Sequence, residues 1–369
     1  MDKPGKITVG LSGGVDSAVA ALLLQQQGWQ VQGLFMKNWE EDDTANHCGA
    51  SADLAVAQAV AKHLNIELRT ANFATEYWDQ VFTYFLAEYK RGRTPNPDIM
   101  CNSVIKFRAF LDHALVQGAA AIATGHYANS ATKDDQIYLL TAKDPNKDQT
   151  YFLHRLTQQQ LALSYFPLGN FTKTKVREIA HQASLPNATR KDSTGICFIG
   201  ERRFRDFLAK YLPPNPGPIK TPEGQLLGEH QGLMYYTMGQ RQGLGIGGIS
   251  GHKEAPWFVC AKDLPSNTLF VVPGREHHKL WSKILEADNW HWINTEHNLL
   301  TNAHLLAKTD YQARIRHRQP LQQCQIHHIT SDHYQITFAK PQWSPAPGQA
   351  IVLYKDGICL GGGIILRTL

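Results

Sequence analysis

Long hydrophobic runs are missing from this chain of 369 residues. No apolar stretch approaches the roughly 18 residues that a membrane-spanning helix requires. The first six residues also lack the apolar core that a secretory signal contains. We therefore expect a cytoplasmic protein without a membrane partner.

Cysteine pairs and a large excess of charge are missing as well. None of the six cysteines forms a Cys-x-x-Cys pair, which excludes the spacing of common zinc sites. In a reducing cytosol we expect no structural disulfide. Lysine and arginine total 37 against 32 acidic residues, so the net charge is only +5. That balance permits a nucleic-acid partner without requiring one.

In the first half of the chain, strand and helix patterns alternate. Strands are predicted over Lys6–Leu11, Val31–Met36, Glu67–Asn72 and Ala119–Thr124. Helices are predicted over Asp16–Gln27, Ser51–His63 and Thr75–Lys90. This alternation predicts an α/β fold with a Rossmann-like parallel sheet covered by helices on both faces. Ligands of such sheets bind at the carboxyl ends of the strands.

The second half has a different organisation. Five prolines between 213 and 222 exclude a helix or a central strand, and we place a domain boundary there. Beyond it we predict short strands over Arg314–Arg318, Tyr334–Phe338 and Ala350–Tyr354, with a hairpin turn at Asp356-Gly357. We therefore predict an α/β domain over 1–210, a small central domain over 211–280 and a β-barrel-like domain over 281–369.

The segment Ile7–Ala20, ITVGLSGGVDSAVA, lacks the lysine of an ordinary phosphate-binding loop. Its pattern predicts a buried strand, a glycine turn and a helix. Gly13 and Gly14 let backbone N–H groups approach an anion, and a helix N-terminus adds favourable potential. Asp16 is able to hold Mg²⁺ directly or through water. The plainer alternative is a tight turn with Asp16 as the helix N-cap.

Cys101 has unusual neighbours. It follows Thr94-Pro-Asn-Pro-Asp98, where two X-Pro bonds favour a stiff, extended loop. A helix is predicted from about Ser103, and a thiol near a helix start has a lowered pKa. Three basic side chains flank the segment and would add to that effect, namely Arg91, Arg93 and Lys106. Cys197, in contrast, is interpreted most simply from its local sequence as a buried, inert thiol.

Taken together, these motifs resemble the tRNA-specific 2-thiouridylase family over essentially the whole chain. The motifs that carry the resemblance are GLSGGVDS at 10–17, TPNPDxxCN at 94–102, GHY at 125–127, KDQTYFL at 147–153, DSTGICFIG at 192–200, TMGQRQGLGIGG at 237–248, PGQ at 347–349 and CLGGG at 359–363. The first also resembles the loop of N-type ATP pyrophosphatases, which cleave ATP between its α- and β-phosphates. An absent lysine fits that chemistry, because the γ-phosphoryl group is not transferred.

The resemblance implies ATP-dependent 2-thiolation of the wobble uridine (U34) in a tRNA anticodon loop, with tRNAs for lysine, glutamate and glutamine as acceptors and with Mg²⁺. The residues implied in ATP binding are Gly10, Leu11, Ser12, Gly13, Gly14, Val15, Asp16, Ser17, Met36 and Gly125. Those implied at the target base or the tRNA are Asn96, Pro97, Asp98, His126, Lys147, Asp148, Gln149, Arg316, His317 and Gln349.

The resemblance also implies the route of the sulfur. Cys197 would carry a persulfide and Cys101 would be its catalytic partner, with a transient Cys101–Cys197 disulfide. The sulfur donor would be a persulfide relay protein or a cysteine desulfurase. Asp98 is placed to act as a general acid or base on the uracil ring, and the alternative is a turn-forming role after proline.

The segment Arg314–Arg318 predicts three arginines on one strand face. That face either meets RNA phosphates or is simply solvated. Family members commonly carry Arg-Tyr where this chain has Arg316-His317. Two other functions remain open from the sequence alone. One is an amidoligase that adenylates a carboxylate and leaves both cysteines idle; the other is a non-catalytic RNA-binding protein with a relic nucleotide loop.

Overall fold

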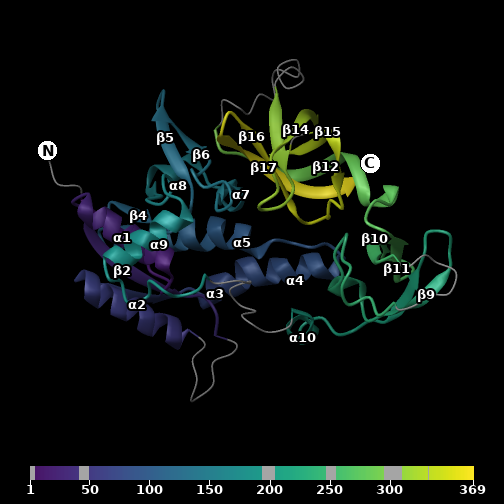
Figure 1. The fold of residues 1–369 in the computed structure, drawn as a ribbon, viewed down its shortest axis with the longest axis horizontal. Helices are drawn as coiled ribbons and strands as arrows, with labels where there is room; N and C mark the ends of the chain where they lie inside the picture. The colour runs from purple at the N-terminus through teal and green to yellow at the C-terminus, as the bar shows by residue number, and fades with distance from the viewer. Residues whose placement is uncertain (1–4, 41–49, 193–203, 247–254, 295–309, 331) are drawn as a thin grey trace.

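The computed structural model describes residues 5–40, 50–192, 204–246, 255–294, 310–330 and 332–369. In these residues the chain forms a parallel sheet with helices, a small central sheet and a C-terminal barrel (Figure 1). This confirms the predicted fold class. The residue boundaries of the three domains stay a prediction.

The α/β part is built on a five-stranded sheet in the order β3-β2-β1-β4-β7, in which every paired strand is parallel. Its strands are β1 (Lys6–Gly10), β2 (Gln30–Lys37), β3 (Leu68–Asn72), β4 (Ala121–Ala123) and β7 (Ser164–Tyr165). The chain leaves β1 toward β2 on one side and later returns to β4 on the other. The crevice between the ends of β1 and β4 is therefore the place where a ligand is expected.

Helices cover this sheet at the predicted positions. The helical segments around it include α1 (Val15–Gln26), α2 (Ser51–Leu64), α3 (Ala74–Tyr77), η1 (Trp78–Phe82), α4 (Thr83–Lys90), α5 (Pro97–Met100), η2 (Cys101–Ala109), α6 (Phe110–Val116) and α9 (Lys173–Gln182). The predicted helix at Thr75–Lys90 is confirmed as the continuous run α3-η1-α4. Its middle, like the stretch that begins at Cys101, is π-helical, a form that is frequent at functional sites.

The helix predicted from about Ser103 begins six residues earlier, at Pro97. The Asn96 side chain caps it by accepting a hydrogen bond from the Asp98 N–H at 3.1 Å, and proline suits the first helical position because its missing N–H would have no helical partner. Cys101 therefore lies inside the helical run and not at its start, which corrects the sequence prediction.

The central sheet has the order β10-β11-β8-β9. Its strands are β8 (Gly217–Lys220), β9 (Leu226–His230), β10 (Trp257–Asp263) and β11 (Thr268–Pro273). The short helices of this part of the chain are α10 (Phe204–Ala209), η3 (Leu233–Tyr235) and η4 (His278–Leu280). The expectation that the prolines between 213 and 222 exclude a central strand is wrong, because β8 lies within this segment, contains Pro218 and pairs with both β11 and β9.

Six strands form the C-terminal barrel, which closes where β12 pairs with β17. They are β12 (Trp281–Trp292), β13 (Tyr311–Arg314), β14 (Gln322–Thr330), β15 (His333–Trp343), β16 (Ala350–Lys355) and β17 (Ile358–Thr368). The hairpin turn predicted at Asp356-Gly357 is confirmed. The strand predicted over Arg314–Arg318 is wrong beyond Arg314, because the chain turns there and Arg318 has a φ of +66°.

A hairpin from the first half extends the barrel sheet, and the sequence did not predict it. It consists of β5 (Asn129–Lys133) and β6 (Gln136–Leu140), and β6 pairs with the start of β17. Short helices follow it, namely α7 (Thr150–Leu153) and α8 (Gln158–Ala162). One continuous apolar core runs from Leu34 in the α/β part to Leu269 in the central sheet and Val352 in the barrel.

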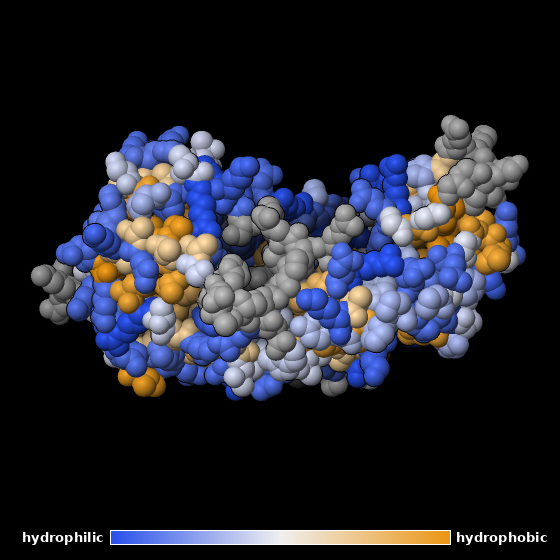
Figure 2. Space-filling model, turned by 90° about the horizontal axis from the view of Figure 1, so that it is seen from below, coloured by the Kyte–Doolittle hydropathy of each residue, from blue (hydrophilic) through white to orange (hydrophobic). Residues whose placement is uncertain are grey.

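The face of the molecule seen in Figure 2 is mostly hydrophilic, with hydrophobic side chains in scattered groups. Among the described residues, no helix combines the length and the apolar character needed to cross a membrane.

A buried ion pair links the barrel to the α/β part. Arg314 of β13 donates to Asp148, and both side chains are about 95% buried. Asp148 also accepts from the Ala142 N–H at 3.0 Å, while Arg314 donates to the Tyr354 hydroxyl at 2.8 Å. The pair therefore belongs to a network in which each charge has several partners.

Arg314→Met is expected to lower the free energy of unfolding by about 3–5 kcal/mol, because it leaves a buried carboxylate without its cation. Arg108→Met, at an exposed helix position, is the control and is expected to change it by less than about 0.5 kcal/mol. Denaturant unfolding measures both. Equal unfolding midpoints for the wild type and the Arg314 variant would contradict the assigned role of this pair.

Candidate active site

The glycine turn lies at the carboxyl end of β1. The Leu11 N–H donates to the Leu34 carbonyl at 2.9 Å, and the Ser17 hydroxyl accepts from the Ser12 N–H and donates to the Gly14 carbonyl at 3.0 Å. Gly13 has a φ of +77°, a conformation that favours glycine. The N-cap of α1 is Gly14, so Asp16 stands in the first turn of the helix and the plainer interpretation of Asp16 as a cap is wrong.

The loop that follows β4 lies against this turn. A Cβ on Gly125 would come within 2.8 Å of the Asp16 carbonyl carbon and the Ser17 nitrogen. Met36 reaches the turn from β2, where its methyl group would be 3.2 Å from a Cβ on Gly10. The structure thus brings together the residues implied in ATP binding, and their individual contacts with the nucleotide stay a prediction.

Loop 125–127 also contacts the helix that carries Cys101. The His126 ring lies 5.7 Å from that of Phe107, a residue of η2, and His126 Nδ1 is 2.8 Å from the Thr124 hydroxyl. Burial lowers the pKa of His126 well below its usual value, so the imidazole is neutral at physiological pH. One short loop therefore contacts the glycine turn and the helical segment that begins at Cys101.

Asp98 stands at the second position of α5, beside its cap. Burial raises the pKa of Asp98, and the charge of Lys106 opposes that rise. A carboxyl group with a raised pKa is suited to proton transfer near neutral pH.

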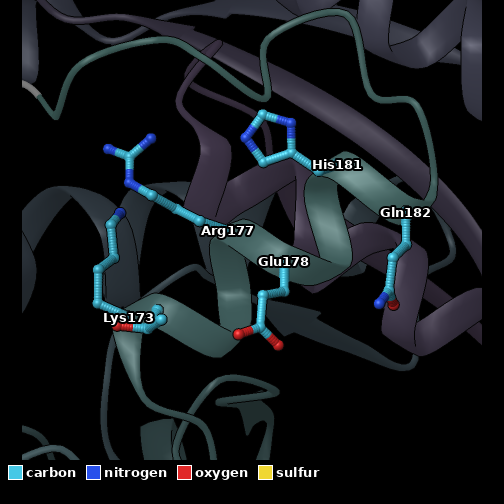
Figure 3. A pocket seen from close by; sticks show the side chains of 6 residues that line it. Lys173, Arg177, Glu178, His181 and Gln182 are labelled. Atoms are coloured by element: carbon cyan, nitrogen blue, oxygen red, sulfur yellow. The ribbon is translucent and has the colours of Figure 1, made fainter.

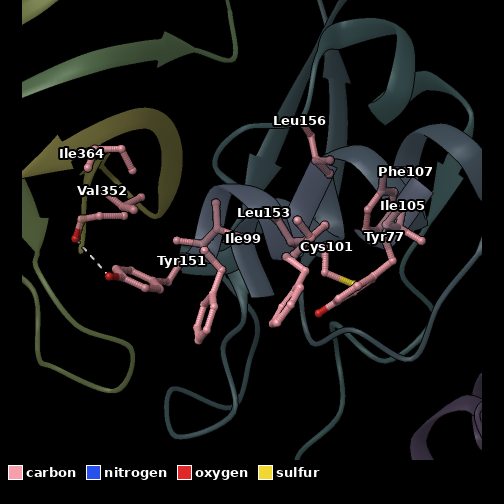
Figure 4. Close-up of a cluster of buried hydrophobic side chains, with 14 of the residues drawn as sticks. Tyr77, Ile99, Cys101, Ile105, Phe107, Tyr151, Leu153, Leu156, Val352 and Ile364 are labelled. Carbon is pink, nitrogen blue, oxygen red and sulfur yellow. Dashed lines mark hydrogen bonds between the residues drawn. The ribbon is translucent and has the colours of Figure 1, made fainter. Parts of the chain in front are cut away.

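Cys101 is 2% exposed. It lies among apolar side chains, which include Tyr77, Ile105, Phe107 and Leu153 (Figure 4). Cys197 and the predicted disulfide lie outside the described residues, and their roles stay a prediction.

A network of charges lies beside the glycine turn. Asp16 Oδ1 accepts hydrogen bonds from the Tyr127 hydroxyl at 2.9 Å and from Lys173 Nζ at 2.7 Å. Lys173 is also 2.7 Å from Asp192 Oδ1. Lys173 could not be predicted from the sequence, because no local motif marks a residue that reaches the turn from 157 positions away.

Asp192 is held by further cations. Lys147 and Arg177 each approach its carboxylate to 2.7 Å. Partial burial would raise its pKa, but hydrogen bonds from Lys147 and Lys173 lower the pKa of Asp192 to about 2. The carboxylate is therefore ionised throughout the physiological range.

The other residues implied at the tRNA lie between the turn and the barrel. Gln149 Oε1 accepts from the Tyr127 N–H at 2.9 Å, and His317 Nε2 lies 3.1 Å from the Asp148 carbonyl oxygen. Lys147 pairs with Asp192, while Asp148 is buried against Arg314. The side chains at 147–149 thus connect the surroundings of the glycine turn to the barrel, and their contacts with RNA stay a prediction.

The barrel also holds the extended segment before α5. Gln349 Nε2 donates to the Thr94 carbonyl at 2.6 Å, and the Thr94 N–H donates to the Pro347 carbonyl at 2.8 Å. Gly348 has a φ of +93°, and a Cβ there would meet the Thr94 nitrogen at 2.8 Å. The Pro-Gly-Gln motif therefore positions the segment that leads to Asn96 and Asp98.

Two arginines flank one tryptophan near this contact. The guanidinium carbons of Arg316 and Arg275 lie 5.1 and 5.0 Å from the ring of Trp343. The sequence predicted Arg316 alone, as part of a strand face that does not exist.

Three family models match the chain in succession. They are described as a tRNA methyl transferase HUP domain over residues 5–201, a tRNA methyl transferase PRC-barrel domain over 205–273 and an aminomethyltransferase beta-barrel domain over 282–365. The succession agrees with the α/β part, the central sheet and the barrel of the structure.

Curated relatives match over nearly the full length. A tRNA-specific 2-thiouridylase from Nitrosomonas eutropha is 56% identical over 98% of this chain and 98% of its own. One from Methylobacillus flagellatus is 54% identical over 99% of both chains. A solved 4-thiouridine synthetase–RNA complex with bound ATP has a TM-score of 0.35 and 17% identity, over 57% of this chain and 50% of that one, a likeness too slight to support an inference.

Proposed function

Because this chain belongs to the family of tRNA-specific 2-thiouridylases, we propose that it replaces the C2 oxygen of the wobble uridine (U34) of tRNA with sulfur, using ATP. The observation that carries the proposal is the loop 125–127, which packs on the first turn of α1 and on the helix of Asp98 and Cys101. A nucleotide at the turn and a base at Asp98 would therefore share one site.

The first step activates an oxygen. The C2 oxygen of uracil is a poor leaving group, and transfer of AMP to it makes it a good one. Asp98 takes the N3 proton as the C2 oxygen attacks the α-phosphorus of ATP. The bond from the α-phosphorus to the bridging oxygen breaks, and pyrophosphate leaves. Backbone N–H groups at the glycine turn stabilise the charge that develops on the leaving group.

The second step exchanges sulfur for oxygen, and two routes balance. The terminal sulfur of a Cys197 persulfide attacks C2 and expels AMP, after which the Cys101 thiolate attacks the Cys197 sulfur and frees the thiocarbonyl. Alternatively, Cys101 attacks first and releases sulfide, which then attacks C2. Both routes end in a Cys101–Cys197 disulfide, so each turnover requires reduction and reloading. A persulfide relay protein or a cysteine desulfurase would reload Cys197, and the reaction belongs in the reducing cytoplasm.

Magnesium fits this site as a companion of ATP. In the part of the chain that the structure describes, no cluster of three or more His, Cys, Asp or Glu side chains is placed to hold a metal alone. Mg²⁺ commonly takes one or two carboxylates together with substrate phosphates. Asp16 supplies one such carboxylate in the first turn of α1, where the ion would neutralise phosphate charge.

The tRNA would lie against the barrel and the motifs that it holds. The guanidinium groups of Arg275 and Arg316 beside Trp343 offer cations for the RNA backbone. The further tRNA contacts proposed are His126, Lys147, His317 and Gln349. The acceptors proposed are the tRNAs for lysine, glutamate and glutamine.

Asp98→Asn is expected to slow pyrophosphate release by about 100-fold or more, because it removes the proposed base. The active form of a base is the carboxylate, so the wild-type rate should rise as pH passes upward through the pKa of Asp98. Burial raises the pKa of Asp98. The rate should therefore rise at a higher pH than the pH at which an exposed aspartate ionises. Single-turnover pH profiles test this, with Asp112→Asn, at an exposed position of α6, as the control. A pH profile of the Asp98→Asn protein identical to that of the wild type would exclude Asp98 as the base.

The function itself is tested with purified protein, ATP, an unmodified tRNA transcript and a persulfide donor. We expect 2-thiouridine at the wobble position by nucleoside mass spectrometry, with one AMP and one pyrophosphate per modified base. An amidoligase would instead release pyrophosphate without tRNA when given a carboxylate and an amine, and a relic RNA-binding protein would release none.

A further inference from the structure

The lysine that the glycine turn lacks is supplied from a distant part of the chain. We propose that Lys173 binds the β- and γ-phosphates of ATP, and that without nucleotide it neutralises Asp16. The inference rests on the proposed use of ATP at this turn.

The start of α9 holds Lys173 in place. Its backbone N–H donates to Asp144 Oδ2 at 2.9 Å, and the Thr172 side chain caps the helix by accepting from the Lys175 N–H. Helices α9 and α1 pack against each other (Figure 1). The Lys173 ammonium thereby comes to the first turn of α1, and its side chain stays 13% exposed.

This position favours anions, and in the structure the carboxylates of Asp16 and Asp192 are the anions that pair with Lys173. A helix N-terminus carries positive potential, so a cation in the first turn is disfavoured there and an anion is favoured. A phosphate group at this place would meet the N-terminal end of α1, that of α9 and the Lys173 ammonium together. An open surface groove of about 600 Å³ lies along α9 from Lys173 to Gln182, and all the side chains that line it, Lys173 and Arg177 among them, belong to this helix (Figure 3).

Lys173 is able to change partners without leaving a carboxylate unpaired. Asp192 keeps Lys147 and Arg177, both at 2.7 Å. Asp16 keeps the Tyr127 hydroxyl at 2.9 Å and regains a free lone pair at which Mg²⁺ can bind. On binding of MgATP, Asp16 would exchange the Lys173 ammonium for the metal ion, and the ammonium would turn to the phosphates.

Lys173→Met is expected to weaken binding of α,β-methylene-ATP with Mg²⁺ by about tenfold or more, since a charge-assisted hydrogen bond is lost. AMP, which lacks the β- and γ-phosphates, should bind the variant as it binds the wild type. Lys175→Met is the matched control, because Lys175 lies on the same helix and pairs with the exposed Glu178, and we expect it to bind both ligands normally. Isothermal titration calorimetry without tRNA measures all of these affinities.

The ratio of the affinity for α,β-methylene-ATP to the affinity for AMP distinguishes a role of Lys173 in phosphate binding from a role in support of the fold. Equal weakening of the analogue and of AMP would show that Lys173 only supports the turn, and no weakening would show that it has no role; either result overturns the inference alone. A wild-type protein that fails to bind the analogue would overturn the proposed use of ATP as well. Lys173→Gln, which keeps a hydrogen-bond donor to Asp16, gives the same ratio if the methionine variant is unstable.

Discussion

Replacing Cys101 with serine is expected to abolish 2-thiouridine formation, with a loss of at least about a thousandfold, because serine cannot cleave a persulfide. Adenylation requires no thiol. The first turnover of pyrophosphate release should therefore survive in the Cys101→Ser protein, although the sulfur transfer that follows is lost. Nucleoside mass spectrometry and a pyrophosphate assay on the same samples separate the two steps. Cys197→Ser is expected to behave in the same way.

The burial of Cys101 calls for a control on folding. Cys324 is also buried, at 5% exposure, within the apolar interior of the barrel. Cys324→Ser therefore places a hydroxyl in a comparable apolar setting at a distance from the proposed chemistry, and we expect thiolation to persist. Full thiolation by the Cys101→Ser protein would contradict the proposed role of Cys101 in freeing the transferred sulfur.

Gly13→Ala is expected to weaken ATP binding by roughly tenfold to a hundredfold, from backbone strain and a steric clash together. The φ of +77° disfavours any side chain, and the new Cβ would lie 2.7 Å from the Asp53 carbonyl oxygen and 2.9 Å from the Arg190 guanidinium. The turn must move to relieve this contact, which misplaces the N–H groups proposed to hold pyrophosphate.

Gly118 offers a control with matched backbone geometry. Its φ is +79°, and a Cβ there would meet no atom within 4 Å. Gly118→Ala therefore reproduces the strain without the clash and should bind ATP as the wild type does. Equal ATP affinities for the Gly13→Ala protein and the wild type would show that the turn does not bind the phosphates.

Local patterns were sufficient to predict the α/β part of the chain. Short apolar strands that alternate with helical stretches located β1, β2, β3 and β4 within a few residues, because each element is specified by its own periodicity. The start of α5 was also marked in the sequence by Asn96-Pro97, an N-cap followed by proline. The prediction from Ser103 overlooked that signal.

Contacts between distant segments could not be predicted from these patterns. Lys173 reaches Asp16, and Gln349 reaches Thr94, only because the fold brings their elements together. Alternation in Arg314–Arg318 suggested an exposed basic face, since a period of two gives two faces without saying which is buried. Arg314 proved to be buried with Asp148, a partner 166 residues away.

Two sequence motifs that were expected to contact tRNA make structural contacts within the protein. The Pro-Gly-Gln segment at 347–349 fixes the strand-like approach to Asp98, and Asp148 fixes the barrel to the α/β part. Both motifs therefore position the proposed site, whatever further contacts they make with RNA. Their variants should affect the placement of the target base before they affect ATP binding.

The proposed adenylation of uracil is tested most directly by the fate of one oxygen atom. An anticodon stem-loop with ¹⁸O at C2 of the wobble uridine, treated with the protein, ATP and a persulfide donor, should give AMP that carries one ¹⁸O for each 2-thiouridine formed. Unlabelled AMP alongside 2-thiouridine would mean that water, and not the base, attacks the α-phosphorus, and activation of the C2 oxygen by adenylation would be excluded.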